Sequence, residues 1–221
     1  QFISTQEIYD FITDSNQDGL INLKDVVHEN SILLNDTDDD GNGFTDDLIG
    51  WDSSGFVSET SNVAKPDNNP FPDATGGNWS HGTHVAGILG ATSDNNIGIA
   101  SVAFDVKIIP VKGARLNEDN NDFTLTDTYD GMLYAAKAGY YADTFTIINC
   151  SWGSVIDNIN TQNSFQSAVI NVIHNIYGSI IVAAAGNGEM DENGEWTGDE
   201  TYSPFFPASF DNVISVSPID C

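Results

Sequence analysis

Three short segments of the sequence carry residues of kinds that can take part in catalysis or bind an extended peptide. His81 opens an apolar stretch, HGTHVAGIL, whose large residues recur at helical spacing. Asn187 lies between two glycines directly after the apolar run IIVAAAG, so a strand there would project its amide at the carboxyl end. The segment NCSWGS follows another apolar run and offers backbone groups at Ser151, Trp152 and Gly153. These residues could supply a general base, an oxyanion donor and an edge that pairs with an extended peptide.

The position of His81 suits a general base. The positive end of a helix dipole disfavours a cation, which favours an imidazole that must accept a proton. His84 lies three residues further on, and such a pair could instead bind a metal. Zinc proteases use the spacing HExxH, and no glutamate stands between His81 and His84, so we do not expect zinc. Taken singly, His81 could be a packing residue and the Gly-Asn-Gly turn an ordinary turn.

Two acidic segments have the spacing of calcium-binding loops. In DSNQDGLINLKD, oxygen ligands alternate as in EF-hand and dockerin loops, with glycine at position 6. The ligands of this loop would be Asp14, Asn16, Asp18, the Leu20 carbonyl, Asn22 and Asp25, and Ile21 would point to the core. Carboxylates this close repel one another without a cation, although a solvated acidic loop is the alternative.

The second acidic segment, DTDDDGNGFTDD, permits two registers. One uses Asp36, Asp38 and Asp40 with Gly41 and Asp47, and the other uses Asp38, Asp40 and Asn42 with Gly43 and Asp46. The sequence does not choose between them. A third acidic stretch, Asp191–Glu200, is either a weaker ion site or a solvated loop.

The elements that must position these residues alternate between helices and strands. Helical spacing predicts a buried helix at 81–91 and further helices at 126–138 and 165–177, the last stopped by Gly178. Apolar runs predict strands at 106–111, 145–150, 179–184 and 212–216, and residues 61–80 read as a long loop. This pattern indicates an α/β fold with a parallel sheet covered on both faces, whose ligands bind beyond the carboxyl ends of the strands.

Composition narrows the possible partners. The chain has 221 residues, with 33 Asp and Glu against 6 Lys and Arg and a formal net charge of −27. Nucleic acid is therefore not an expected partner, because phosphate binding needs clustered Lys and Arg. No run of eighteen apolar residues occurs, so we expect no membrane insertion. Hydrophobic residues make up 40%, which is enough for a core, and Cys150 reads as one of its small residues.

In their order along the chain, these segments resemble the subtilisin-like serine proteases, or subtilases. The matching segments over residues 81–217 are HGTHVAGIL, NIGIASVAFDVKIIPVK, NCSWGS, IIVAAAGNG and YSPFFPASFDNVISV, the last with Pro207 as a candidate cis-proline. The resemblance implies a three-layer fold with a mainly parallel sheet and helices on both faces. It implies peptide-bond hydrolysis of a protein or peptide substrate by a Ser-His-Asp triad, with His81 as the base and Asn187 in the oxyanion hole. Ser151, Trp152 and Gly153 would pair with the substrate.

The resemblance departs from the family pattern at two places. The nucleophile of the family lies in a Gly-Thr-Ser segment, which does not occur in this sequence. Asp52 superficially matches the aspartate motif, but the family insertion that resembles DDDGNGFTDDLIGWD usually follows the catalytic aspartate, so we expect that aspartate upstream of Gln1. We therefore expect the central part of a catalytic domain, incomplete at both ends and inactive alone. Residues 1–60 would form a calcium-binding insertion region and 61–221 the catalytic part, and the remaining segments of its own domain would be partners.

Two other functions fit parts of the sequence. One is a catalytically inactive subtilase relative that binds peptides along Ser151–Gly153, and the other is a calcium-dependent, dockerin-like binding module. Dockerins carry two such loops on a much smaller chain, and a module of that kind leaves residues 81–217 unexplained. Calcium outside cells is abundant enough to fill loops of weak affinity, so calcium favours a secreted or cell-surface protein.

Overall fold

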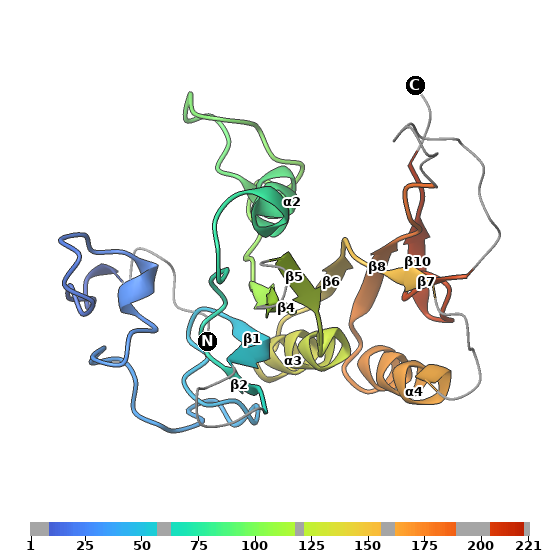
Figure 1. Cartoon of the computed structure of the whole chain (residues 1–221), viewed down its shortest axis with the longest axis horizontal. Helices are drawn as coiled ribbons and strands as arrows, with labels where there is room; N and C mark the ends of the chain where they lie inside the picture. Colours follow the sequence, from blue (N-terminus) through green and yellow to red (C-terminus); the bar gives the residue numbers. More distant parts are fainter. Residues whose placement is uncertain (1–8, 57–62, 118–121, 156–161, 189–203, 219–221) are drawn as a thin grey trace. The chain divides into compact units, whose positions relative to one another are not determined.

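The computed structural model describes residues 9–56, 63–117, 122–155, 162–188 and 204–218 (Figure 1). The chain divides into two compact units, Gln1–Ala142 and Asp143–Cys221. The first unit contains η1 (Leu23–Asp25), β1 (Trp51–Phe56), β2 (Lys65–Asp67), η2 (Gly77–Ser80), α2 (His81–Gly90), β3 (Val111–Lys112), β4 (Ala114–Asn117), β5 (Asp122–Leu125) and α3 (Thr128–Tyr141). The second contains β6 (Ile147–Cys150), β7 (Ser154–Val155), α4 (Gln162–Asn175), β8 (Ile180–Ala184), β9 (Phe205–Phe206) and β10 (Val213–Val216).

Strand β1 is the centre of the first unit. It pairs parallel with β3 and antiparallel with β2, while β4 and β5 form a separate antiparallel hairpin. Helix α3 packs against β1 and β3, because Gly131 lets its backbone approach Ser53 and Val111: a Cβ at Gly131 would lie 2.8 Å from Ser53 Oγ and 2.9 Å from Val111 Cγ1.

Aromatic side chains fasten the second acidic segment to α3. The ring of Phe44 meets those of Trp51 and Tyr134 edge to face, at centroid distances of 5.0 and 4.8 Å. The ammonium of Lys137 lies 4.8 Å above the Phe44 ring. Burial and the hydrogen-bonded carboxylate of Asp47 raise the pKa of Tyr134, so its hydroxyl stays protonated and donates to Asp47.

The second unit is built on a parallel sheet with strand order β10–β8–β6. Alternate residues of β6 and β8 are buried, including Ile148, Cys150 and Ile181, and α4 contacts β8 and buries Ile170 and Ile173. Cys150 is buried, which confirms it as a small core residue, and its burial raises the pKa of the thiol to about 12. The other face of the sheet is exposed at Ile147 (60%), Ile214 (53%) and Val216 (51%).

The α/β class is confirmed, with several differences in its parts. The predicted strands at 179–184 and 212–216 match β8 and β10. Gly178 follows the end of α4 and has a φ of +67°, as expected of a helix stop, and the Phe206–Pro207 bond is cis. The described strands form four sheets, two of them wholly antiparallel, instead of one mainly parallel sheet.

Four local predictions are wrong. The predicted strand at 106–111 is reduced to β3 at Val111–Lys112, since residues 106–110 have no regular structure and the carbonyl of Pro110 accepts from Trp51 N–H instead. Residues 61–80 are not wholly a loop, because they contain β2 and η2. Helix α2 has no buried residue, and Ile21 is 54% exposed rather than directed into the core.

Candidate active site

His81 is the first residue of α2, and its side chain is exposed. The turn η2 leads directly into the helix, where the hydroxyl of Ser80 donates to Gly77 O (2.8 Å) instead of capping α2. Within the described residues, the imidazole of His81 has no hydrogen bond to Asp52 or to any other side chain. It is therefore open to an external proton donor.

The far end of α2 is held by backbone hydrogen bonds rather than by a buried face. The N–H groups of Val102 and Ala103 donate to the carbonyls of Ile88 and Leu89, each at 3.0 Å. These bonds satisfy two of the carbonyls that every helix leaves free at its end. No residue of α2 is fully buried, and only Val85–Gly87 and Gly90 are half-buried, so attachments at its two ends contribute to its position.

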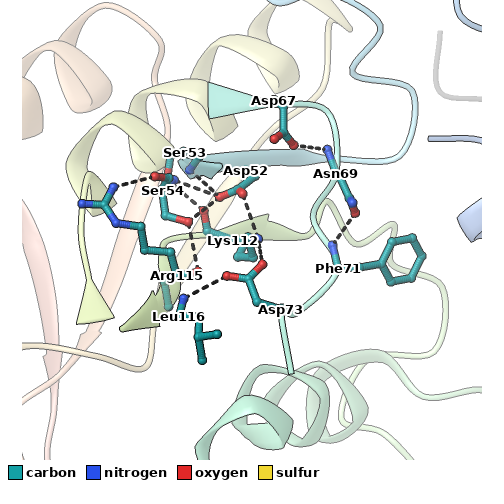
Figure 2. Close-up of polar contacts among 12 residues, drawn as sticks. Asp52, Ser53, Ser54, Asp67, Asn69, Phe71, Asp73, Lys112, Arg115 and Leu116 are labelled. Atoms are coloured by element: carbon teal, nitrogen blue, oxygen red, sulfur yellow. Dashed lines mark hydrogen bonds and ion pairs between the residues drawn. The ribbon is translucent and has the colours of Figure 1, made fainter. Parts of the chain in front are cut away.

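An ion-pair network joins a buried aspartate, a half-buried lysine and a partly exposed aspartate ahead of α2 (Figure 2). The ammonium of Lys112 lies between two carboxylates, 2.8 Å from Asp52 and 2.5 Å from Asp73. The second oxygen of Asp73 accepts the backbone N–H of Leu116 at 2.9 Å. Burial lowers the pKa of Lys112, but the two carboxylates raise it more, so this pKa lies above its ordinary value and the ammonium is charged.

Both carboxylate oxygens of Asp52 have partners in this network. Its side chain is buried, with a residue exposure of 1%, and one of its oxygens accepts from Ser54 N–H, Ser54 O–H and Gly55 N–H. The other oxygen faces Lys112. These contacts hold the side chain of Asp52 in β1. In the sequence, Asp52 is only a superficial match to a triad residue.

In the second unit, Ser151, Trp152 and Gly153 link β6 to β7 and are all half-buried. The amide of Asn149 donates to Ser151 Oγ at 2.9 Å. Gly153 lies directly against β9: a Cβ there would lie 2.3 Å from the Phe205 ring and 2.6 Å from Phe206 O. Only glycine fits this approach, so the backbone of this segment is held close to β9.

Asn187 follows β8 in the same unit. The backbone N–H of Ala185 donates to Val216 O (2.8 Å), which extends the β8–β10 pairing by one residue. Gly186 and Gly188 then adopt φ values of +101° and +82°, which allow the chain to turn sharply around Asn187. The side chain of Asn187 is exposed, so its amide is free to meet a ligand.

The two acidic segments share one hydrogen-bond pattern. Numbered from Asp14, position 1 accepts from the N–H of position 6, position 3 from that of position 5, and position 5 from that of position 7. Numbered from Asp38, the second segment makes the same three bonds, from Gly43, Asn42 and Phe44. The pattern is thus repeated in the register that begins at Asp38.

The last residue of the first loop is held differently. Both oxygens of Asp25 accept backbone N–H groups, from Ser15 and Asn16 on one side and from Asn22 on the other. These bonds, that from Asn22 foremost, hold the pKa of Asp25 below its ordinary value, although burial opposes them. Among the described residues, no three Asp, Glu, His or Cys side chains are grouped closely enough to hold a metal by themselves.

Sequence reasoning missed Lys112 and Asp73. Their only local signal was the position of Lys112, one of six cations in an acidic chain, directly after an apolar run. Asp73 lies 39 residues away from Lys112, within a segment that looked like an unstructured loop. Asp191–Glu200 and the last residue, Cys221, lie outside the described residues.

Comparison with known proteins gives a match over most of the chain. Residues 23–221 match the sequence model of the subtilase family, Peptidase S8. A thermophilic serine proteinase from Bacillus sp. (strain AK1) is 37% identical over 141 residues, covering 64% of this chain and 29% of the relative. Thermitase from Thermoactinomyces vulgaris is 32% identical over 154 residues, covering 70% and 45% respectively.

Among solved structures, sphericase superimposes with a TM-score of 0.51 and 28% identity, covering 75% of this chain and 44% of sphericase. The chain therefore spans less than half the length of each of these three proteins. No helix in the described residues is long and apolar enough to cross a membrane.

Proposed function

The chain belongs to the subtilase family, and on that basis we propose that it forms part of a serine endopeptidase in which His81 is the general base and Asn187 the oxyanion donor. The observation that supports this most is the exposure of both side chains at the ends of regular elements. His81 opens α2, and Asn187 follows β8 between two glycines in the left-handed region. Neither place calls for a polar residue on packing grounds.

In this mechanism, a serine from outside the described residues attacks the carbonyl carbon of the scissile peptide bond. His81 accepts the hydroxyl proton as the new C–O bond forms, and gives it to the leaving amine as the C–N bond breaks. Water then hydrolyses the resulting acyl-enzyme ester, again with His81 as the base. The carbonyl oxygen takes up the negative charge, and the amide of Asn187 donates to it. The backbone of Ser151–Gly153, held in place by β9, pairs with the extended peptide substrate.

The test uses the natural full-length protein, assayed on casein and on a chromogenic peptide. We expect Asn187→Ala to lower kcat by about 10²–10³-fold with little change in KM, because the amide acts only on the developing charge. His81→Ala should lose almost all activity, whereas His84→Ala, the matched control on the same helix, should retain it. A full-length protein that binds peptides but neither hydrolyses them nor reacts with a serine-directed fluorophosphonate would contradict the proposal and favour a peptide-binding relative.

We further propose that both acidic segments bind calcium. The ligands of the first would be Asp14, Asn16, Asp18, Leu20 O, Asn22 and Asp25. Those of the second would be Asp38, Asp40, Asn42 and Asp46, with Asp36 and Asp47 as the ligands of the other register. The supporting observation is the shared hydrogen-bond pattern, together with positive φ at Gly19 (+85°) and Gly43 (+94°), where calcium loops turn sharply. In the part of the chain that the structure describes, no three acidic side chains are grouped closely enough to hold a metal, so amide oxygens, backbone carbonyls and water would complete each shell.

Calcium would stabilise the fold by binding only the native state. We expect the melting temperature of the chain to fall when EDTA is added and to recover with excess calcium, while excess magnesium restores it less. An unchanged melting temperature would exclude tightly coupled calcium. A need for abundant calcium supports a further proposal, that the protein works outside the cell or at its surface.

A further inference from the structure

We propose that Lys112 and Asp73 are positioning residues for His81: their ion pair fixes the segment that leads into α2 and so sets the place of the general base. This inference rests on the proposed function of His81. We call the set of Asp52, Lys112, Asp73 and the Leu116 N–H the Lys112 clamp (Figure 2).

We call residues 68–80, which lead from β2 into α2, the approach segment. The clamp joins this segment to two different sheets. Lys112 lies in β3 and pairs with Asp52 of β1, so its ammonium belongs to the central sheet of the unit. Asp73 reaches that ammonium with one oxygen and the N–H of Leu116 in β4 with the other. A single carboxylate thus ties the approach segment to β3 and β4 at once.

A second contact, closer to His81, attaches the approach segment to the same β4–β5 hairpin. Trp79, two residues before His81, packs edge to face against Phe123 of β5, with ring centroids 6.4 Å apart. Phe123 is the direct cross-strand partner of Leu116. Asp73 therefore contacts β4 and Trp79 contacts β5 at the same cross-strand pair of the β4–β5 hairpin. The residues between Asp73 and Trp79 are attached to the hairpin at both ends.

Between these attachments the chain is held by the turn η2, in which Trp79 N–H donates to Gly76 O at 3.1 Å, but its glycines pack against no other residue. Gly76 and Gly77 have φ values of +79° and +52°, and nothing lies within 4 Å of the Cβ that either could carry. Helix α2 buries no residue, and its far end is held through the carbonyls of Ile88 and Leu89. The end that carries His81 therefore depends on the clamp and on Trp79.

Asp73 is not needed to neutralise the charge of Asp52. A buried Asp52 needs one cation, which Lys112 supplies, and Asp73 is a partly exposed side chain on a separate segment. Its two oxygens are divided between Lys112 and Leu116, an arrangement that fixes its direction as well as its charge. Direction is what a residue that positions another segment must control.

The first experiment compares Asp73→Ala and Asp73→Asn with the control Asp105→Asn, an exposed carboxylate between α2 and β3, in the 221-residue chain. Hydrogen exchange measured by mass spectrometry should become about tenfold faster in peptides covering 74–84 of Asp73→Ala, because local opening there becomes easier, and remain unchanged in peptides of α4. Asp73→Asn keeps an acceptor for Leu116 but loses the ion pair, so its effect should be intermediate. Equal exchange in all variants would overturn the clamp, whether or not the protein is a protease.

The second experiment links the clamp to His81. In nitrogen-15 spectra of the imidazole rings, the His81 signals should shift or broaden in Asp73→Ala, while those of His174 in α4 should not. In the natural full-length protein, Asp73→Ala and Lys112→Met should lower kcat about tenfold or more with KM nearly unchanged, since a displaced base loses rate rather than binding. Lys107→Met, which removes an exposed lysine before β3, is the control and should keep kcat.

The outcomes separate the two proposals. Faster exchange near His81 without a change in its ring signals or in kcat would show that the clamp does not position the base. A wild-type protein without hydrolytic activity would end the proposed function, while the exchange and imidazole measurements would still decide whether the clamp holds the helix start.

Discussion

Replacing Gly153 with alanine tests the tightest contact in the proposed substrate-binding wall. The added Cβ would lie 2.3 and 2.8 Å from two carbons of the Phe205 ring and 2.6 Å from Phe206 O. The ring could rotate away, but the carbonyl could not, because Phe206 is buried and pairs with Ser154 across β7 and β9. Either β9 must move or the Ser151–Gly153 segment must.

We expect Gly153→Ala to lower the free energy of unfolding by about 1–3 kcal/mol, the usual cost of forcing an extra carbon into a packed site. With a urea slope of about 2 kcal/mol/M, a loss of about 2 kcal/mol moves the midpoint by about 1 M. Urea denaturation followed by tryptophan fluorescence measures this shift. Gly82→Ala is the control, since nothing lies within 4 Å of its Cβ, and its stability should be equal or higher by up to about 1 kcal/mol.

A double-mutant cycle with Phe205→Ala divides the cost between ring and carbonyl. Removing the ring removes two of the three close contacts, so the cost of Gly153→Ala should shrink but not vanish. A midpoint unchanged within error in Gly153→Ala alone would refute the close packing of this segment on β9.

Three further predictions concern other parts of the chain. Ile173→Ala should destabilise the second unit by about 2–5 kcal/mol in urea, because this side chain of α4 is fully buried. In calcium titrations by calorimetry, Asp46→Asn should weaken the second loop about tenfold, while Asp36→Asn should change it less than about twofold, if the register begins at Asp38; the reverse result would select the other register. The raised pKa of Lys112 means that its ion pairs stabilise the fold fully below its ordinary pKa of 10.5 and are lost as pH rises through the folded-state value. Stability should therefore fall above about pH 10.5 in the wild type and fall less in Lys112→Met.

Strands and helices with continuous local patterns were predictable from the sequence. Ile180–Ala184 and Val213–Val216 form the centre and edge of one parallel sheet, and their apolar runs suffice to indicate this. Strand β1 was not predictable, because Asp52, Ser53 and Ser54 are polar residues buried in it. The Ser53 hydroxyl donates to the carbonyl of Lys112, 59 residues away, and Ser54 Oγ lies 2.9 Å from the carbonyl oxygen of Ala114, 60 residues away. No local pattern can show these contacts.

The same limit explains the uneven prediction of the site. His81 and Asn187 could be proposed from the sequence because their immediate neighbours form recognisable motifs. Asp73 and Lys112 are ordinary residues in their own segments, and only the pairing of β1 with β3 brings Asp52 to Lys112. The apolar run before Val111 instead predicted a strand that the structure lacks, since Val106 and Ile108 are exposed and lie outside any strand.

The exposed face of the β6–β8–β10 sheet has a consequence for handling the isolated chain. Ile147, Ile214 and Val216 form an exposed hydrophobic surface that favours self-association, while a net charge of −27 makes copies of the chain repel one another. In dilute buffer this repulsion reaches tens of ångströms, but in about 1 M salt it is confined to about 3 Å. High salt, or acidification toward the pI of about 4.1, should therefore convert a dispersed solution of this chain into aggregates.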